Sequence, residues 1–210
     1  MLCFGAATAL MLWARPRRRR VSPIGRARRW TLALALALTL AAGCLGFPAW
    51  ASLLAGIGLG IGLEPLPPRA PGAGGPLLWL ATVVLAPVFE EILYRERLLL
   101  DLRGAMGAPC ALAASTFAFA ISHLDAWSVL ATACIGLALG VLALVTRCVW
   151  LCVALHAGLN LASVLQGAPP VRLAPALATS AALGWTLLLS AVGLSLGTRS
   201  TQTPGPPEPR

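Results

Sequence analysis

The sequence predicts an all-α protein, a polytopic transmembrane helix bundle with about seven to eight membrane segments. Of its 210 residues, 58% are hydrophobic and 11% are charged, and the mean hydropathy is +0.82. A soluble domain usually has about 25% charged residues, so this composition is typical of an integral membrane protein. Apolar runs follow one another at residues 2–14, 30–47, 49–63, 76–95, 105–124, 127–146, 149–166 and 173–196. Because a spanning helix needs about 20 residues, the first and third runs are short for a full crossing.

Residues 1–29 combine an apolar segment with an arginine-rich stretch that we expect on the cytoplasmic side. All 16 basic residues of the chain are arginines, and eight of them lie between Arg15 and Arg29. A basic run directly before an apolar span marks the cytoplasmic side and contacts anionic lipid. We therefore expect the lipid bilayer as its partner, and no nucleic acid.

Residues 30–197 are expected to form the membrane domain. Leu and Ala alternate in the run 30–47 with the period of a strand, but its unbroken apolar length favours a membrane helix. Prolines and glycines predict a loop at 64–75. The proline-rich tail at 198–210 is expected to be disordered.

The run 49–63 leaves the topology open. If it spans the membrane, then Arg97, Arg103 and Arg147 lie opposite the basic cluster, and if it does not, they lie on the same side. The positive-inside rule favours the second arrangement.

Two adjacent glutamates, Glu90 and Glu91, lie inside an apolar run together with Arg95. Ionised groups in a bilayer are costly, and they are a functional-site hypothesis by default. On a helix, Glu91 and Arg95 are four residues apart and can pair, whereas Glu90 points about 100° away. We expect Arg95 to hold Glu91 ionised and to leave Glu90 available as a general base. The alternative is an ion pair that only joins two helices.

Both histidines of the chain also lie in apolar segments. His123 could orient a water molecule while Glu90 takes its proton. His156 and Asn160 share a helical face and could donate to the oxyanion that forms when a carbonyl is attacked. Gly158 between them would let another backbone or an extended substrate approach closely. The alternative for these side chains is packing and interhelical hydrogen bonding.

The six cysteines lie in apolar stretches without the spacing of a disulfide framework, and most of them are expected to be buried hydrophobes. Cys148, Cys152 and His156 recur at steps of four residues. Two thiols and one imidazole could ligate a metal ion, but this helix supplies no fourth ligand.

Three motifs follow in order on successive apolar segments: Glu-Glu-x-x-x-Arg, Phe-x-x-x-His and His-x-x-x-Asn. This order resembles the CAAX protease and bacteriocin-processing (CPBP) family, also called Abi, of intramembrane endopeptidases, and is similar to type II CAAX prenyl endopeptidases. The resemblance covers about residues 76–166, which we take as the core. It implies a bundle of membrane helices around a site open to the membrane and to water. Glu91 and Arg95 match supporting positions of the first motif.

The resemblance also implies the catalytic roles. Glu90 matches the glutamate that activates water, together with the histidine of the second motif, His123. His156 and Asn160 match the pair assigned to the oxyanion. A divalent metal such as zinc remains an open alternative, with Glu90, His123 and His156 as candidate ligands, although we favour the metal-free assignment.

The implied activity is hydrolysis of a peptide bond in a membrane-anchored protein or peptide. The arginine-only, Ala/Leu/Gly-rich composition suggests a GC-rich bacterial genome, hence a multi-pass protein of the bacterial inner (cytoplasmic) membrane. Such a protein would process a peptide, a bacteriocin-like leader or a C-terminal sorting signal. The alternatives are a non-catalytic immunity or partner protein of the same family and a carrier, but a carrier is expected to show inverted repeats and none is visible.

Overall fold

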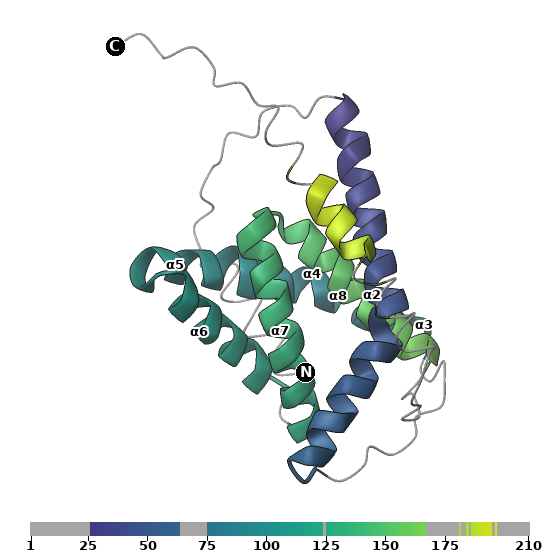
Figure 1. Ribbon diagram of the computed structural model, residues 1–210, viewed down its shortest axis with the longest axis vertical. Coiled ribbons are helices and arrows are strands. Elements are labelled where there is room, and N and C mark those ends of the chain that lie inside the picture. The colour runs from purple at the N-terminus through teal and green to yellow at the C-terminus, as the bar shows by residue number, and fades with distance from the viewer. Residues whose placement is uncertain are drawn as a thin grey trace.

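The structure, a computed structural model, describes residues 26–63, 75–123, 125–166, 186–194 and positions 181, 184 and 196. Every regular element in these residues is a helix, which confirms the all-α fold class (Figure 1). Three described helices are long and apolar enough to cross a membrane, Trp30–Ile57, Pro76–Met106 and Ala126–Thr146, and two are apolar but shorter, Ala108–Ile121 and Val149–Leu165. The expectations for the run 2–14, for nearly all of the 64–75 loop and for the tail lie outside the described residues.

The runs 30–47 and 49–63 form one helix, α2 (Arg26–Gly60), and not the two segments that the sequence predicts. Pro48 lies inside this helix. Proline removes one backbone hydrogen bond and usually bends a helix, and α2 changes direction about halfway along its length in Figure 1. The run 49–63 is therefore mostly the second half of one helix, of which Trp30–Ile57 is one candidate span.

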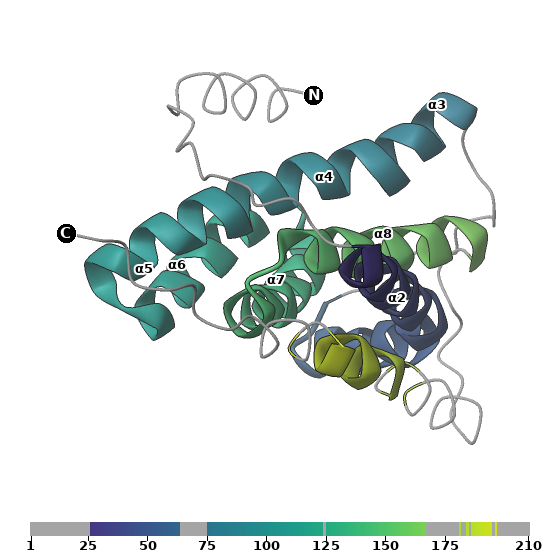
Figure 2. The same ribbon diagram turned by 90° about the horizontal axis from the view of Figure 1, so that it is seen from above.

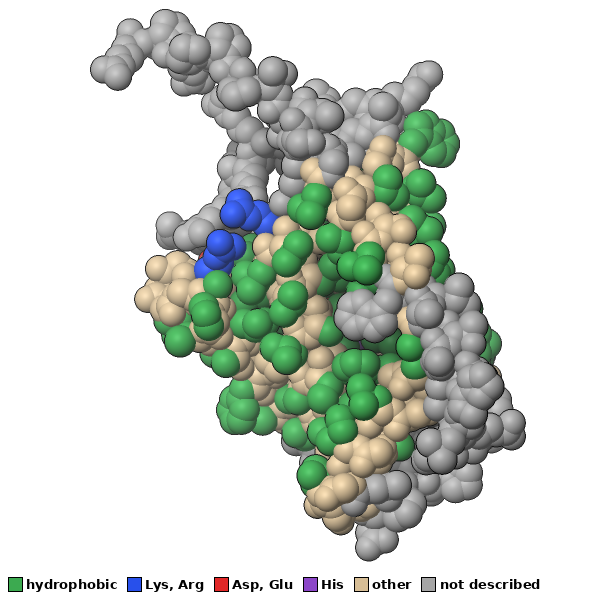
Figure 3. Space-filling model, viewed as in Figure 1, with side chains coloured by type: hydrophobic (Ala, Val, Ile, Leu, Met, Phe, Trp, Pro, Cys, Tyr) green, Lys and Arg blue, Asp and Glu red, His purple; other side chains and the backbone are tan. Residues whose placement is uncertain are grey.

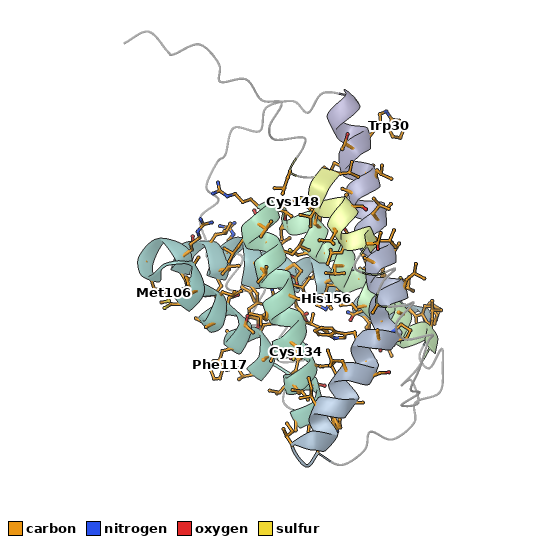
Figure 4. The ribbon with its side chains drawn as sticks, viewed as in Figure 1. Trp30, Met106, Phe117, Cys134, Cys148 and His156 are labelled. Carbon is orange, nitrogen blue, oxygen red and sulfur yellow. The ribbon has the colours of Figure 1, made fainter. Side chains whose placement is uncertain are left out.

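A single crossing by α2 matches the topology in which the later arginines lie on the side of the basic cluster. Figure 4 agrees with this topology, because Trp30, near the start of α2, and Cys148, directly after Arg147, lie toward the same end of the molecule.

The helix that carries the glutamates changes type along its length. It comprises α3 (Pro76–Trp79), η1 (Leu80–Leu85), α4 (Ala86–Glu91), η2 (Ile92–Leu99) and α5 (Leu100–Met106), of which η1 and η2 are π-helical. Pro87 cannot donate a backbone hydrogen bond to the preceding turn, which fits a change of helix type at the start of α4. π-helical turns are rare and frequently occur at functional sites. Here they flank the segment that carries Glu90 and Glu91.

The remaining helices turn back on this one at well-defined ends. They are α6 (Ala108–Ile121), α7 (Ala126–Thr146) and α8 (Val149–Gln166). Gly107, at φ +81°, separates α5 from α6, so the run 105–124 is not one helix. Asp125 caps α7 by accepting a 2.9 Å hydrogen bond from the Ser128 amide. Arg147 ends α7 in the left-handed conformation, at φ 46° and ψ 34°.

Helix α8 lies at the centre of the bundle, between α2 and the Pro76–Met106 helix (Figure 2). Two glycines allow α2 and α8 to meet backbone to backbone. A Cβ atom on Gly158 would lie 3.1 Å from the Gly43 Cα atom, and the Cys44 thiol lies 3.3 Å from the Gly158 carbonyl oxygen. The close approach expected at Gly158 is therefore made by α2.

The outer surface of the bundle is largely apolar. Figure 3 shows apolar side chains over much of the visible face, with arginine side chains at one end. Exposed large hydrophobic residues occur on α2, α3, α6, α7 and α8, among them Leu53, Leu77, Phe117, Val141 and Trp150. Soluble monomers rarely expose contiguous apolar patches above a few hundred Å². This exterior, with the spanning helices, identifies an integral membrane protein.

Candidate active site

An ion pair buried in the bundle joins Glu91 of α4 to Arg95 of η2. Arg95 Nε lies 3.2 Å from Glu91 Oε2, and the two side chains are 1% and 0% exposed. Arg95 also donates from Nη2 to the Gly136 carbonyl oxygen of α7, over 3.2 Å. Its guanidinium group lies 4.4 Å from the centre of the Phe119 ring, within the range of a cation–π contact. The predicted pairing of Glu91 with Arg95 is confirmed, and the pair ties α4 to α6 and α7.

The second carboxylate oxygen of Glu91 contacts His156 of α8. His156 Nδ1 lies 2.9 Å from Glu91 Oε1, and its Nε2 lies 3.8 Å from Glu90 Oε2. An ionised carboxylate only accepts hydrogen bonds, so Nδ1 carries a hydrogen and donates it to Glu91. Glu91 thereby sets the orientation of the imidazole and turns its Nε2 toward Glu90. Figure 4 shows His156 in the interior of the bundle.

The two glutamates occupy different environments, as the sequence predicts. The Glu90 side chain is 25% exposed, whereas that of Glu91 is fully buried. Glu90 interacts electrostatically with both His156 and His123. The more accessible carboxylate, that of Glu90, therefore lies within electrostatic range of both imidazoles.

His123 lies in the turn that follows α6, and its ring is held from two directions. Its Nδ1 atom lies 3.1 Å from the Phe119 carbonyl oxygen and 3.2 Å from Ser122 Oγ. A carbonyl oxygen only accepts, so Nδ1 carries a hydrogen and a neutral ring has its lone pair on Nε2. That tautomer is suited to accept a hydrogen bond from water.

Asn160 joins α8 to the π-helical segment η1. Its Nδ2 donates to the Thr82 carbonyl oxygen over 2.9 Å. The sequence predicts a donor to an oxyanion at this position, and the structure assigns one of the two amide hydrogens to a contact between helices.

Phe119 is part of the site, although the sequence did not predict a functional role for it. Its fully buried ring packs edge-on against three other rings, with centroids 5.2 Å from Tyr94, 5.2 Å from His123 and 5.9 Å from His156. The available signal was the Phe-x-x-x-His spacing itself, because a residue one turn before a histidine lies on the same helical face. Phe119 therefore connects the two imidazoles to each other.

A metal site is not apparent in the described parts of the chain. No group of three or more His, Cys, Asp or Glu side chains there is arranged to hold a metal ion. Glu90, His123 and His156 approach one another without forming such a group. Cys152 is fully buried, and its thiol lies 3.4 Å from the Leu139 carbonyl oxygen. Cys152 is buried as predicted, but the expectation that most cysteines are buried is wrong for the described residues, because Cys110 is exposed and Cys44, Cys134 and Cys148 are only partly buried.

Part of the chain is similar to a known protein family. Residues 72–162 match the family model described as type II CAAX prenyl endopeptidase Rce1-like. No curated protein and no solved structure matches the chain. The matched residues contain all three motifs and every side chain of the buried cluster. Residues 72–162 of the chain are thus similar to the Rce1-like type II CAAX prenyl endopeptidases, a family of membrane proteases.

Proposed function

We propose that this protein is an intramembrane endopeptidase that hydrolyses a peptide bond in a membrane-tethered protein or peptide. The observation that carries the proposal is the buried series Arg95, Glu91, His156 and Glu90, in which each side chain lies next to the following one. Membrane helices rarely contain four ionisable groups in contact, and such groups mark functional sites. These contacts support a structural role for the Glu91 carboxylate and a chemical role for the Glu90 carboxylate.

Glu90 is the proposed general base. It removes a proton from a water molecule that the His123 Nε2 atom orients, and the resulting hydroxide attacks the carbonyl carbon of the scissile bond. The same carboxylic acid then returns the proton to the departing amine. Arg95 neutralises the charge of Glu91, so that Glu91 can hold His156 without itself competing for the water proton.

His156 and Asn160 are the proposed oxyanion donors. The second hydrogen of the Asn160 amide is one donor, and the His156 Nε2–H is the other. Because Nδ1 already donates to Glu91, His156 must carry both ring hydrogens for this role, and the Glu90 carboxylate, 3.8 Å from Nε2, balances its charge before the reaction. Each well-placed donor contributes about 3 kcal/mol to stabilisation of the transition state. The reaction as proposed requires no metal ion.

The proposed substrate has a lipid or transmembrane anchor next to the cleavage site. A prenylated CAAX peptide is the substrate that the family description indicates. For a bacterial inner-membrane protein, a peptide leader or C-terminal sorting signal presents the same chemistry, a bond close to a membrane anchor.

The test is cleavage of a fluorogenic farnesylated CAAX peptide by the purified full chain in lipid nanodiscs. We expect cleavage by the wild type and its loss in both Glu90→Gln and His123→Asn. Glu96→Gln is the matched control, because Glu96 is an exposed glutamate on the same helix, and it should retain wild-type activity. A parallel comparison of processed membrane proteins in cells covers substrates other than CAAX peptides. If the two site variants process as much as the wild type in both assays, the protein acts by binding and not by proteolysis.

A further inference from the structure

Gly136 of α7 lies directly behind the buried ion pair, although it belongs to none of the three motifs. Its carbonyl oxygen accepts the hydrogen bond from Arg95 Nη2. A Cβ atom at this position would lie 3.0 Å from Phe119 Cδ1 and 3.4 Å from Arg95 Nη2. The first distance is shorter than an ordinary van der Waals contact, so a side chain here would displace the ring.

The Phe119 ring has little freedom to move away. It is fully buried, it lies under the Arg95 guanidinium group, and it packs against both imidazoles. A shift of the ring by a few tenths of an ångström therefore reaches Arg95, His123 and His156 together. Protein interiors are close-packed, and they transmit such displacements.

We propose that Gly136 is a positioning residue: the absence of its side chain allows Phe119 and Arg95 to meet against α7 and sets both imidazoles at their distances from Glu90. The effect on catalysis rests on the proposed function, whereas the effect on the imidazoles does not. The sequence alone suggests only helix packing for the small-residue pair Gly136 and Gly140. The structure separates the two glycines, because only Gly136 contacts the site.

Gly140 provides a matched control one helical turn away. A Cβ atom on Gly140 would contact Leu112 Cδ1, the end of a flexible side chain, and would lie 4.0 Å from Leu99 Cδ2. Gly140→Ala therefore adds the same methyl group to the same helix against aliphatic neighbours. It should leave the geometry of the imidazoles unchanged.

The first measurement is NMR of the imidazole rings in the full chain, labelled with ¹⁵N and ¹³C at histidine and held in lipid nanodiscs. The chain has two histidines, so a single His123→Asn variant assigns both sets of resonances. In Gly136→Ala we expect the ring resonances of both His123 and His156 to shift, and in Gly140→Ala we expect them to overlay the wild type. Unchanged imidazole spectra in a folded Gly136→Ala protein would overturn the proposal, whatever the activity of the chain.

The second measurement separates catalysis from binding, with the farnesylated CAAX peptide as the probe. Misplacement by about 1 Å can cost about 100-fold in rate, so a displacement of a few tenths of an ångström should lower kcat about threefold to tenfold. KM should change little, because Gly136 lies behind the ion pair. In a Phe119→Leu background, where the added methyl group has room, Gly136→Ala should lower kcat by less than about twofold further.

The outcomes distinguish the two proposals. Shifted imidazole resonances in a protein that cleaves no substrate would contradict the proposed function and support the role of Gly136 in positioning. Equal losses of kcat in Gly136→Ala and Gly140→Ala, or an undiminished loss in the Phe119→Leu background, would instead show a general effect on packing. If Gly136→Ala does not fold, then Gly136→Ala with Phe119→Leu should fold, and failure of both would also overturn the proposal.

Discussion

Replacing Arg95 with methionine should strongly destabilise the folded bundle. The substitution keeps most of the side-chain volume but leaves the Glu91 carboxylate, which is 0% exposed, without its counter-charge. Removing one partner of a buried ion pair typically costs about 3 to 5 kcal/mol. Loss of the hydrogen bond to the Gly136 carbonyl oxygen adds about 1 kcal/mol at most. We therefore expect the free energy of unfolding to fall by roughly 4 kcal/mol.

The double variant Glu91→Gln with Arg95→Met tests this cause. Glutamine has the shape of glutamate and can still accept a hydrogen bond from His156 Nδ1, but it carries no charge. If the uncompensated carboxylate is responsible, the double variant should recover about 2 kcal/mol or more relative to Arg95→Met alone. Equilibrium unfolding in mixed micelles, followed by far-ultraviolet circular dichroism, measures each variant. Arg97→Met is the matched control and should change stability by less than about 0.5 kcal/mol.

Two results would refute the reasoning. One is a loss below about 1 kcal/mol in Arg95→Met, which would mean that water or another cation compensates Glu91. The other is a double variant that is no more stable than the single one. In that case the guanidinium group would act through Phe119 and Gly136, and its charge would be secondary.

Three further predictions concern contacts around the site. Asn160→Leu removes the hydrogen bond to the Thr82 carbonyl oxygen and should destabilise the bundle by about 1 kcal/mol in the same unfolding assay. Gly158→Ala places a methyl group against the backbone of α2 and should lower the free energy of unfolding by about 1 to 3 kcal/mol. Its control is Gly56→Ala, whose methyl group meets nothing within 4 Å and which should be neutral or stabilise α2 by up to about 1 kcal/mol. Arg147→Gly relieves a left-handed conformation at the end of α7 and should raise stability by about 1 kcal/mol; a decrease would show that the arginine side chain contributes more than the strain costs.

The parts of the site that are local in sequence could be predicted. Glu91 and Arg95 are one helical turn apart, so helical geometry alone brings them together. The different environments of Glu90 and Glu91 follow from the same geometry, because adjacent residues on a helix point about 100° apart.

The contacts between distant segments could not be predicted in the same way. His156 Nδ1 meets a carboxylate 65 residues earlier in the chain, and Asn160 meets a carbonyl group 78 residues earlier. The hydrophobic periodicity of one helix does not specify which side chains of another helix lie opposite its own. The predicted oxyanion pair therefore has structural partners that its own segment does not reveal.

The helix boundaries differ from the apolar runs at Pro48, at Gly107 and along the helix that carries the glutamates. Pro48 suggested a break between two apolar runs, but α2 continues through it. A proline can remain inside a membrane helix when other groups satisfy the freed carbonyl. The π-helical segments η1 and η2 depend on tertiary contacts, and no residue pattern in the apolar run indicates them.

The backbone contact of Gly43 with Gly158 links the N-terminal helix to the helix that holds His156. The family match begins at residue 72, well after Gly43. A chain shortened to start at residue 72 would keep every motif. It would lose α2, whose backbone contacts α8 at Gly158. The smallest unit able to fold around the site is thus larger than the unit that sequence comparison recognises. Position 43 should therefore accept only glycine, because a Cβ atom there would lie 2.5 Å from the Leu155 carbonyl oxygen of α8.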